Sequence, residues 1–278
     1  MSKIVFFGFG KLGKDCMVRL NREGHEISHV FTHKDMTLNS VDLYAQDKNI
    51  PFSYKDLRKF PDLLNSHNFE ESLLVSINYR FILDLNIINK FLYAINLHGS
   101  LLPKYRGRTP HVWAIINGEK KTGVTAHIID KGVDTGPIIK QKEVDISPSD
   151  TGHSLLLKFE KIYPDLLISS INNLVKGCKL KVQDNNEASF FGKREPIMGY
   201  IDFQNNSKKI IDFVRAQSNP YPGAYSFLED GKKIIINKLG VFNEKKLDFC
   251  KGQIKKINND YYVRCKDSIL KILDYKLM

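Results

Sequence analysis

The feature that most constrains the fold is the alternation of short apolar segments with helical ones through the first hundred residues. Residues 3–8 are almost wholly apolar and end on glycine, and residues 11–22 place apolar side chains at helical spacing. Further strands are predicted at 27–32, 73–77 and 93–97, with a helix at 43–48 and a short helix or turn at 81–89. This alternation is typical of a parallel sheet covered by helices, so we predict an α/β, Rossmann-like, mostly parallel first domain.

The pattern changes in the last hundred residues. Strands at 122–129 and 138–144 and an amphipathic helix at 151–173 complete the first domain, and residues 181–195 are polar and irregular, as in a linker. After a helix at 207–217, turn residues separate five short strands, at 224–228, 233–239, 252–257, 261–265 and 269–273. We predict a first domain over 1–183, a linker over 184–198 and a smaller β-rich, OB-like domain over 199–278.

Length and composition narrow the protein class. A chain of 278 residues suits two domains, and 42% hydrophobic with 26% charged residues is ordinary for a soluble protein. No segment approaches the ~20 apolar residues of a membrane span, and the start of the chain lacks the pattern of a signal peptide. The four cysteines are scattered without a CxxC pair, which argues against a disulfide framework or a zinc site. We therefore expect a cytoplasmic protein without a metal.

The net charge of +11 is unevenly distributed. Residues 1–150 hold 20 Lys and Arg against 17 Asp and Glu, whereas residues 151–278 hold 22 against 14. A basic C-terminal part suits RNA, the phosphates of a small ligand, or simply a lysine-rich solvated surface. Charge alone leaves all three open.

A glycine motif, GxGxxG, lies at Gly8–Gly13, between the first predicted strand and helix. That is the context of a dinucleotide site. The acidic residue that such a site needs at the end of the second strand is displaced, because Asp35 comes late. The alternative is that the glycines keep the first strand–helix turn tight, as in any Rossmann-like sheet.

The strand at 93–97 runs into Asn96-x-His98, whose side chains point to the same face because they alternate. They emerge at the carboxyl edge of the sheet, where α/β proteins place their sites. Amide N–H groups can stabilise an oxyanion and an imidazole can move a proton, so the pair suits acyl chemistry. A carboxylate nearby, such as Asp134 in the next loop, would orient the imidazole and raise its pKa. A capped turn is the simpler interpretation of each motif.

The loop that follows is rich in glycine and cations. Gly107 gives it room to approach a ligand, and Lys104, Arg106 and Arg108 place three cations within five positions. This spacing suits a phosphate or a charged cofactor tail.

Several motifs in order resemble the formyltransferase family, which contains methionyl-tRNA, glycinamide ribonucleotide and sugar N-formyltransferases. In the first domain they are Asn96–Pro103, Arg106-Gly107, Thr122–Thr125 and Asp134–Gly136. In the second they are Phe191–Pro196, Val214–Ala216, Asn219–Ala224 and Gly252–Ile254 with Cys265. The resemblance covers nearly the whole chain and implies a folate-dependent N-formyltransferase.

The resemblance also implies roles for individual residues. Asn96, His98 and Asp134 match the family's catalytic triad, with 10-formyltetrahydrofolate as the formyl donor and no metal. The folate is expected against the segments Tyr79, Arg80, Phe81, Ile82 and Asp130, Lys131, Gly132, Val133, Asp134. Substrate contacts are expected from Gly99, Ser100, Lys104, Arg106 and Arg108. The glycine motif would then be a fold feature.

The family's branches differ in the acceptor amine. Transfer-RNA enzymes carry a basic, glycine-rich insertion after the second strand, whereas residues 32–51 here hold two lysines against three aspartates. Tyr79-Arg80 and Lys104–Pro110 resemble the sugar branch. We therefore expect a nucleotide-linked amino-deoxy sugar as substrate, such as dTDP-4-amino-4,6-dideoxyglucose or its 3-amino isomer, for a surface glycan such as O-antigen.

Two alternatives remain open at this point. One is a methionyl-tRNA formyltransferase, which the basic C-terminal part would suit. The other is an NAD-binding Rossmann module without transferase activity, which the glycine motif would suit. For the sugar enzyme we expect neither a nucleic-acid nor a membrane partner, and a homodimer is one possible assembly.

Overall fold

The computed structural model describes residues 2–35, 37–64, 69–242 and 249–278, and the chain divides into two compact units. The first unit comprises residues 1–107, 123–144 and 158–190. The second comprises residues 108–122, 145–157 and 191–278. Two short segments of the predicted first domain therefore group with the C-terminal unit.

A seven-stranded sheet forms the first unit, in the order β3-β2-β1-β4-β5-β7-β8. Its strands are β1 (Lys3–Gly8), β2 (Glu26–Phe31), β3 (Phe52–Ser53), β4 (Ser72–Ile77), β5 (Tyr93–His98), β7 (Lys121–Ile128) and β8 (Ile138–Asp145). The pairs β1–β2, β1–β4, β4–β5 and β2–β3 are parallel, and β5–β7 is antiparallel. The prediction of a mostly parallel sheet is confirmed, and its reversal occurs at β5–β7.

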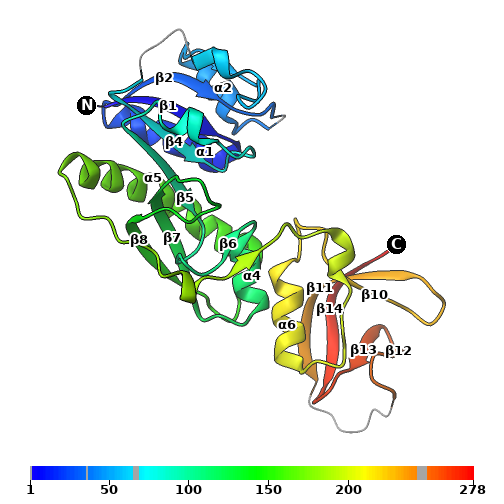
Figure 1. The fold of residues 1–278 in the computed structure, drawn as a ribbon. Helices are drawn as coiled ribbons and strands as arrows, with labels where there is room; N and C mark the ends of the chain where they lie inside the picture. The colour runs from blue at the N-terminus through cyan, green and yellow to red at the C-terminus, as the bar shows by residue number, and fades with distance from the viewer. Residues whose placement is uncertain (1, 36, 65–68, 243–248) are drawn as a thin grey trace. The chain divides into compact units, whose positions relative to one another are not determined.

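Both faces of the central strands are buried, which explains their continuous apolar sequence. Val5 and Phe7 of β1 share one core with Leu74 of β4 and with residues of the short helix α3 (Leu85–Ile88). The alternate residues Ile4 and Phe6 are also fully buried. Helix α1 (Gly10–Arg22), drawn in blue in Figure 1, contacts β1, β2 and β4.

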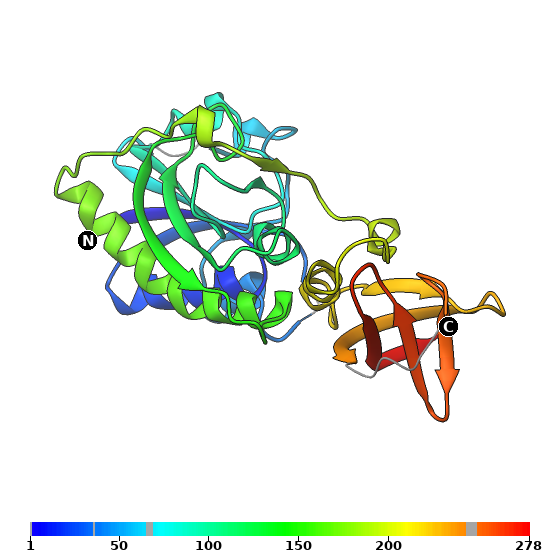
Figure 2. The same ribbon diagram turned by 90° about the horizontal axis from the view of Figure 1, so that it is seen from below.

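One further helix, and most of another from residue 158 onward, also belong to this unit. Helix α2 (Val41–Asp47) begins where the Ser40 hydroxyl accepts a hydrogen bond from the Leu43 N–H at 3.4 Å. Helix α5 (Gly152–Val175) is the long amphipathic helix of the sequence and is drawn in green in Figure 2. Its Glu160 forms an ion pair with Lys11 of α1 at 3.1 Å, so these two helices are neighbours.

The second unit contains a five-stranded antiparallel sheet, in the order β10-β11-β14-β13-β12. Its strands, orange to red in Figure 2, are β10 (Ala224–Phe227), β11 (Lys233–Phe242), β12 (Ile254–Ile257), β13 (Asp260–Arg264) and β14 (Ile269–Leu277). Helix α6 (Ser207–Ala216) packs Ile210 and Val214 into a core with Ile234 and Ile272 of the sheet. A β-rich second domain, as predicted, is confirmed.

Some elements differ from the sequence predictions. Within 81–89, where a short helix or turn was expected, the α-helical part is the four residues of α3. Helix α4 (Pro110–Ile116) was not predicted, because its β-branched and aromatic residues have low helix propensity. The predicted linker contains β9 (Phe190–Phe191), which pairs with β6 (Arg106–Gly107). Two-residue strands are too short to show a period in the sequence.

Among the helices within the described residues, none combines the length and apolar content that crossing a membrane requires. In the same part of the chain, no cluster of three or more His, Cys, Asp or Glu side chains is arranged to hold a metal ion.

The turn after β7 leaves no space for a side chain at Gly136, because an added Cβ would lie 1.8 Å from the Ile128 carbonyl oxygen. We predict that Gly136→Ala lowers the free energy of unfolding by about 1–3 kcal/mol, as overpacking does elsewhere. Gly192→Ala is the control, because nothing lies within 4 Å of its added Cβ. Urea unfolding of the two variants checks this, and equal stabilities would contradict the packing described for the turn.

Candidate active site

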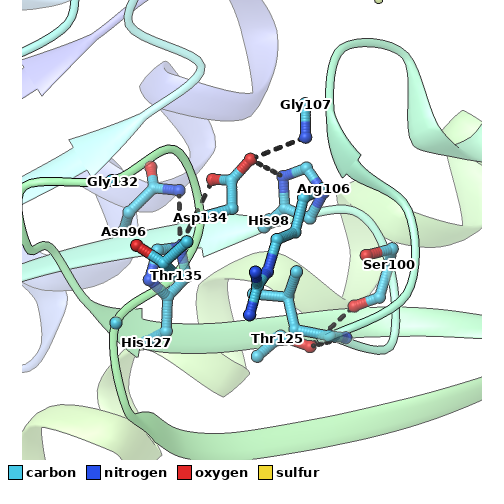
Figure 3. Close-up of polar contacts among 12 residues, drawn as sticks. Asn96, His98, Ser100, Arg106, Gly107, Thr125, His127, Gly132, Asp134 and Thr135 are labelled. Atoms are coloured by element: carbon cyan, nitrogen blue, oxygen red, sulfur yellow. Dashed lines mark hydrogen bonds and ion pairs between the residues drawn. The ribbon is translucent and has the colours of Figure 1, made fainter. Parts of the chain in front are cut away.

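One strand and one loop bring the predicted triad together (Figure 3). Asn96 and His98 lie at the carboxyl end of β5 and point to one face. Asp134 lies in the loop between β7 and β8, and its Oδ2 is 3.5 Å from His98 Nδ1. Asn96 is linked to the carboxylate through a further side chain, His127. The four side chains form one connected polar cluster.

His98 is buried, with 7% of its surface exposed, and both of its ring nitrogens have partners. Nε2 lies 2.7 Å from the Tyr105 carbonyl oxygen. Because a carbonyl oxygen only accepts, Nε2 carries a proton and donates it. In the neutral ring Nδ1 is therefore the basic nitrogen, and it is the one that faces Asp134. This fixes which nitrogen can gain a proton during a reaction.

The pKa of His98 differs from the sequence expectation in its net direction. Burial is the largest influence and lowers the pKa below the ordinary histidine value, because a buried imidazolium loses its hydration. Asp134 raises the pKa, as expected, but by less than burial lowers it. The neutral imidazole therefore predominates at neutral pH, and it is ready to accept a proton.

Asp134 is held in an unusual backbone conformation, with φ of 56°, which is left-handed. Such a conformation is uncommon for residues other than glycine, although Asp tolerates it. Its Oδ2 accepts a hydrogen bond of 2.9 Å from the Gly107 N–H. Burial alone would raise the pKa of Asp134, but the two histidines and this N–H outweigh it and lower the pKa to about 2. The carboxyl is thus ionised at neutral pH.

His127 is a site residue that the sequence analysis did not identify. Its Nδ1 donates to the Ile128 carbonyl at 2.8 Å, so in the neutral ring Nε2 is an acceptor. That acceptor faces the Asn96 amide nitrogen at 3.1 Å and lies 3.5 Å from Asp134 Oδ1. His127 therefore holds one amide hydrogen of Asn96 and leaves the other available for a ligand.

The signal for His127 was present but depended on strand pairing. In the antiparallel pairing of β5 with β7, Asn96 lies opposite His127 and His98 lies opposite Thr125. Opposite residues of an antiparallel pair share a face, with Cβ atoms ~5 Å apart. Without that register, a histidine on a buried strand is indistinguishable from an ordinary core residue.

The segments predicted to contact folate lie after β4 and after β7. Tyr79 stacks on His33, and the Arg80 guanidinium lies 3.9 Å from the centre of the Phe9 ring. Phe81 meets His33 edge-on, whereas Ile82 is 64% exposed. Burial raises the pKa of Tyr79 to about 12, so its hydroxyl remains neutral. These side chains form an aromatic cluster at the carboxyl ends of β1, β2 and β4.

The second folate segment is a closed turn. Asp130 Oδ1 accepts from the Gly132 N–H at 3.0 Å and from the Thr135 hydroxyl at 2.5 Å. Lys131 and Val133 are exposed, and Asp134 points inward to the histidines. The turn thus presents a solvent-facing edge beside the triad, and its contact with folate stays a prediction.

The residues predicted to contact substrate differ in exposure. Gly99 and Ser100 are buried, and the Ser100 hydroxyl donates to the Lys104 carbonyl at 2.7 Å. Arg106 is only 1% exposed, and its guanidinium donates to amide oxygens of the chain itself. Lys104 and Arg108 are exposed. Burial favours a supporting role for Ser100 and Arg106, and a substrate contact of any of the five stays a prediction.

The glycine motif is explained by local packing. Gly10 has φ of 64° at the start of α1, and an added Cβ at Gly13 would lie 2.7 Å from the Val41 side chain. Gly8 would likewise place a Cβ 2.3 Å from the Phe6 ring. These constraints account for the three glycines without a dinucleotide.

Comparison with known proteins identifies the family. Residues 2–171 match the model for formyl transferase, and residues 193–278 match the formyl transferase C-terminal domain. The chain is 34% identical over 284 residues to a methionyl-tRNA formyltransferase of Thermodesulfovibrio yellowstonii, with 98% of this chain and 90% of the relative covered. The match therefore spans both units.

Solved structures show the same fold. WlaRD, a sugar 3N-formyltransferase determined with dTDP and 5-N-formyl-THF, matches with a TM-score of 0.77 at 23% identity, covering 98% of this chain and 97% of WlaRD. The N-formyltransferase of Helicobacter canadensis, in complex with folinic acid and dTDP-3-aminofucose, matches with a TM-score of 0.76 at 21% identity, covering 99% and 100%. At this level of identity the likeness concerns the fold.

The family match corrects the alternative of a dinucleotide-binding module without transferase activity, because two family models account for most of the chain in order. On this evidence the chain belongs to the formyltransferase family and is an enzyme of that class.

Proposed function

We propose that the enzyme transfers the formyl group of 10-formyltetrahydrofolate to the amine of a nucleotide-linked amino-deoxy sugar. The observation that carries the proposal is the cluster of Asn96, the buried His98 and Asp134 at the carboxyl edge of the sheet of a formyltransferase. The folate donor is supported by the folate compounds named in the two solved structures. The same structures contain dTDP or a dTDP-linked amino sugar, which supports this acceptor class.

The proposed chemistry begins with attack of the neutral acceptor amine on the formyl carbon. A carbon–nitrogen bond forms, and the carbonyl electrons move to oxygen. The free N–H of Asn96 stabilises this oxyanion, because its other N–H is already bound to His127. Pre-oriented donors of this kind contribute more than donors that must first turn away from water.

Proton transfer is assigned to His98. Its Nδ1 takes the proton that the attacking nitrogen loses, and Asp134 stabilises the imidazolium that results. The bond between the formyl carbon and N10 of the folate then breaks, and N10 receives the proton. The products are the N-formyl sugar and tetrahydrofolate, and His98 returns to its neutral form.

The acceptor is proposed to be dTDP-4-amino-4,6-dideoxyglucose or its 3-amino isomer, and the product to enter a bacterial surface glycan such as O-antigen. A transfer-RNA acceptor would need clustered cations against the phosphate backbone. The segment between β2 and β3 offers Lys34 and Lys48, with three aspartates in the same stretch. Of these, Asp42 is buried and accepts from the Tyr54 hydroxyl.

Methionyl-tRNA is the second candidate acceptor. It is favoured by the 34% identity to a methionyl-tRNA formyltransferase across nearly the full length of both chains. The C-terminal part of this chain also carries 22 Lys and Arg against 14 Asp and Glu. The two candidates share a donor and a triad, so only the acceptor distinguishes them.

We predict that the enzyme formylates a dTDP-linked amino sugar at least 100-fold faster than methionyl-tRNA, in kcat/KM, which is about 2.7 kcal/mol of transition-state discrimination. The test offers 10-formyltetrahydrofolate with the dTDP-linked 3-amino and 4-amino sugars, UDP-4-amino-4-deoxy-L-arabinose and methionyl-tRNA. Mass spectrometry identifies the formylated product. Turnover of methionyl-tRNA alone would replace the sugar proposal with the second candidate.

We predict that His98→Ala and Asn96→Ala each lower kcat by about 10²–10³-fold, because each removes a group that acts in the transition state. Folate binding, followed by fluorescence quenching or calorimetry, is expected to change little. The control is His25→Ala, in the turn between α1 and β2 at the opposite edge of the sheet. Near-normal turnover in either triad variant would remove that residue from the mechanism.

The acid limb of the pH profile of kcat/KM is predicted to report the protonation of His98. Burial lowers the pKa of this residue, and Asp134 partly restores it. Turnover needs neutral His98, so kcat/KM falls as the pH drops through this lowered pKa. Asp134→Asn removes the influence that raises the pKa, so the acid limb should move to lower pH while the plateau falls. NMR titration of His98 gives the same pKa independently, and a limb that moves to higher pH would contradict the assignment.

A further inference from the structure

Gln183 is a buried side chain whose amide is bonded at both ends. Its Nε2 donates to the carbonyl oxygens of Asp134, at 2.9 Å, and Gly136, at 2.7 Å. Its Oε1 accepts from Nη2 and Nε of Arg106, at 2.8 and 3.2 Å. Two donors and two acceptor positions are the full capacity of a carboxamide, so Gln183 is completely engaged.

One end of this amide holds the turn that carries the triad carboxylate. Asp134 has a left-handed backbone, and Gly136 closes against Ile128 without space for a side chain. A residue in such a conformation persists where its surroundings hold it. Gln183 supplies that restraint from outside the turn, because it binds the carbonyls on both sides of Thr135. The direction of the Asp134 carboxylate therefore depends on Gln183.

The other end anchors the loop that supports the triad histidine. Arg106 binds Gln183 and also Asn185, the latter at 3.0 Å, and its guanidinium lies 5.2 Å from the centre of the Phe190 ring. The backbone N–H of Arg106 donates to the Ser189 carbonyl at 2.8 Å. The segment 183–190 thus forms contacts with both the side chain and the backbone of Arg106.

The neighbours of Arg106 in the chain contact the triad directly. The Tyr105 carbonyl accepts from His98, and the Gly107 N–H donates to Asp134. The Tyr105 N–H in turn donates to the Ser189 hydroxyl at 2.9 Å. The residues of 183–190 therefore hold both the loop behind His98 and the turn behind Asp134.

We propose that Gln183 is a positioning residue for the formyl-transfer site, and that it sets the orientation of Asp134 toward His98 through the backbone of the turn. The segment 183–190, most of which was predicted to be linker, holds the backbone of the active-site loop and turn in place. This inference rests on the proposed function of the triad. It assigns Arg106 an anchoring role in place of direct contact with substrate phosphate.

The test compares two substitutions that affect the two ends of the Gln183 amide differently. Gln183→Met removes both sets of hydrogen bonds and stays neutral. Gln183→Glu keeps an oxygen for Arg106 but cannot donate to the carbonyls of Asp134 and Gly136 when ionised. Gln217→Met is the matched control, because that buried glutamine also joins an arginine, Arg194, to a backbone carbonyl, in the second unit.

Both Gln183 variants are expected to lose about 10–100-fold in kcat, as a displacement of ~1 Å at a reacting group does. KM for the acceptor should stay within about threefold. In Gln183→Met the NMR titration of His98 should move to lower pH, because Asp134 no longer raises its pKa. Gln217→Met should leave kcat and the titration of His98 unchanged.

Wild-type kcat with an unshifted His98 in Gln183→Met would overturn the proposal. So would a loss in Gln183→Met that Gln183→Glu fully rescues, because the effect would then act through Arg106 and not through the turn. If Gln183→Met does not fold, Gln183→Glu alone carries the kinetic test, and normal kcat in that variant overturns the proposal. If the wild type transfers no formyl group, the proposed function fails, and the titration of His98 still decides whether Gln183 positions Asp134.

Discussion

The carboxylate of Asp134 lies between two imidazoles, and the rest of the site is arranged around it. One oxygen faces His98 Nδ1 and accepts from the Gly107 N–H, and the other faces His127 Nε2. This requires a left-handed backbone at Asp134, a glycine two residues later, and bonds to that backbone from outside the turn. The Gly107 N–H donates to this anion, and a proton gained by His98 would place a positive charge beside it.

The reversal of one strand direction makes this geometry available. The parallel part of the sheet brings the carboxyl ends of its strands to one edge, where β5 presents Asn96 and His98. The antiparallel neighbour β7 places His127 beside Asn96 and then leads into the turn that bears Asp134. Strand β7 and the turn after it thus contribute both His127, which orients the amide of Asn96, and Asp134, which faces the imidazole of His98.

Sequence patterns were sufficient for features that depend on local periodicity. The strands of the first unit are recognisable because both faces are buried, and Asn96 and His98 share a face because strand residues alternate. Features that depend on contacts between residues far apart in the chain could not be predicted from the sequence. His127 joins the site only through the β5–β7 register, and the segment 183–190 looks like a linker because its bonds reach residues 103–107 and 134–136. The net pKa shift of His98 depends on burial, which the sequence does not show.

The central claim is that this cluster moves a formyl carbon from a folate nitrogen to a sugar amine. The most direct measurement uses 10-formyltetrahydrofolate labelled with ¹³C in the formyl group, mixed with enzyme and dTDP-4-amino-4,6-dideoxyglucose or its 3-amino isomer, and followed by ¹³C NMR. The account predicts that the label appears in an N-formyl group on the sugar as tetrahydrofolate accumulates. Label that stays on the folate, or is released only as formate, with both sugars would contradict it.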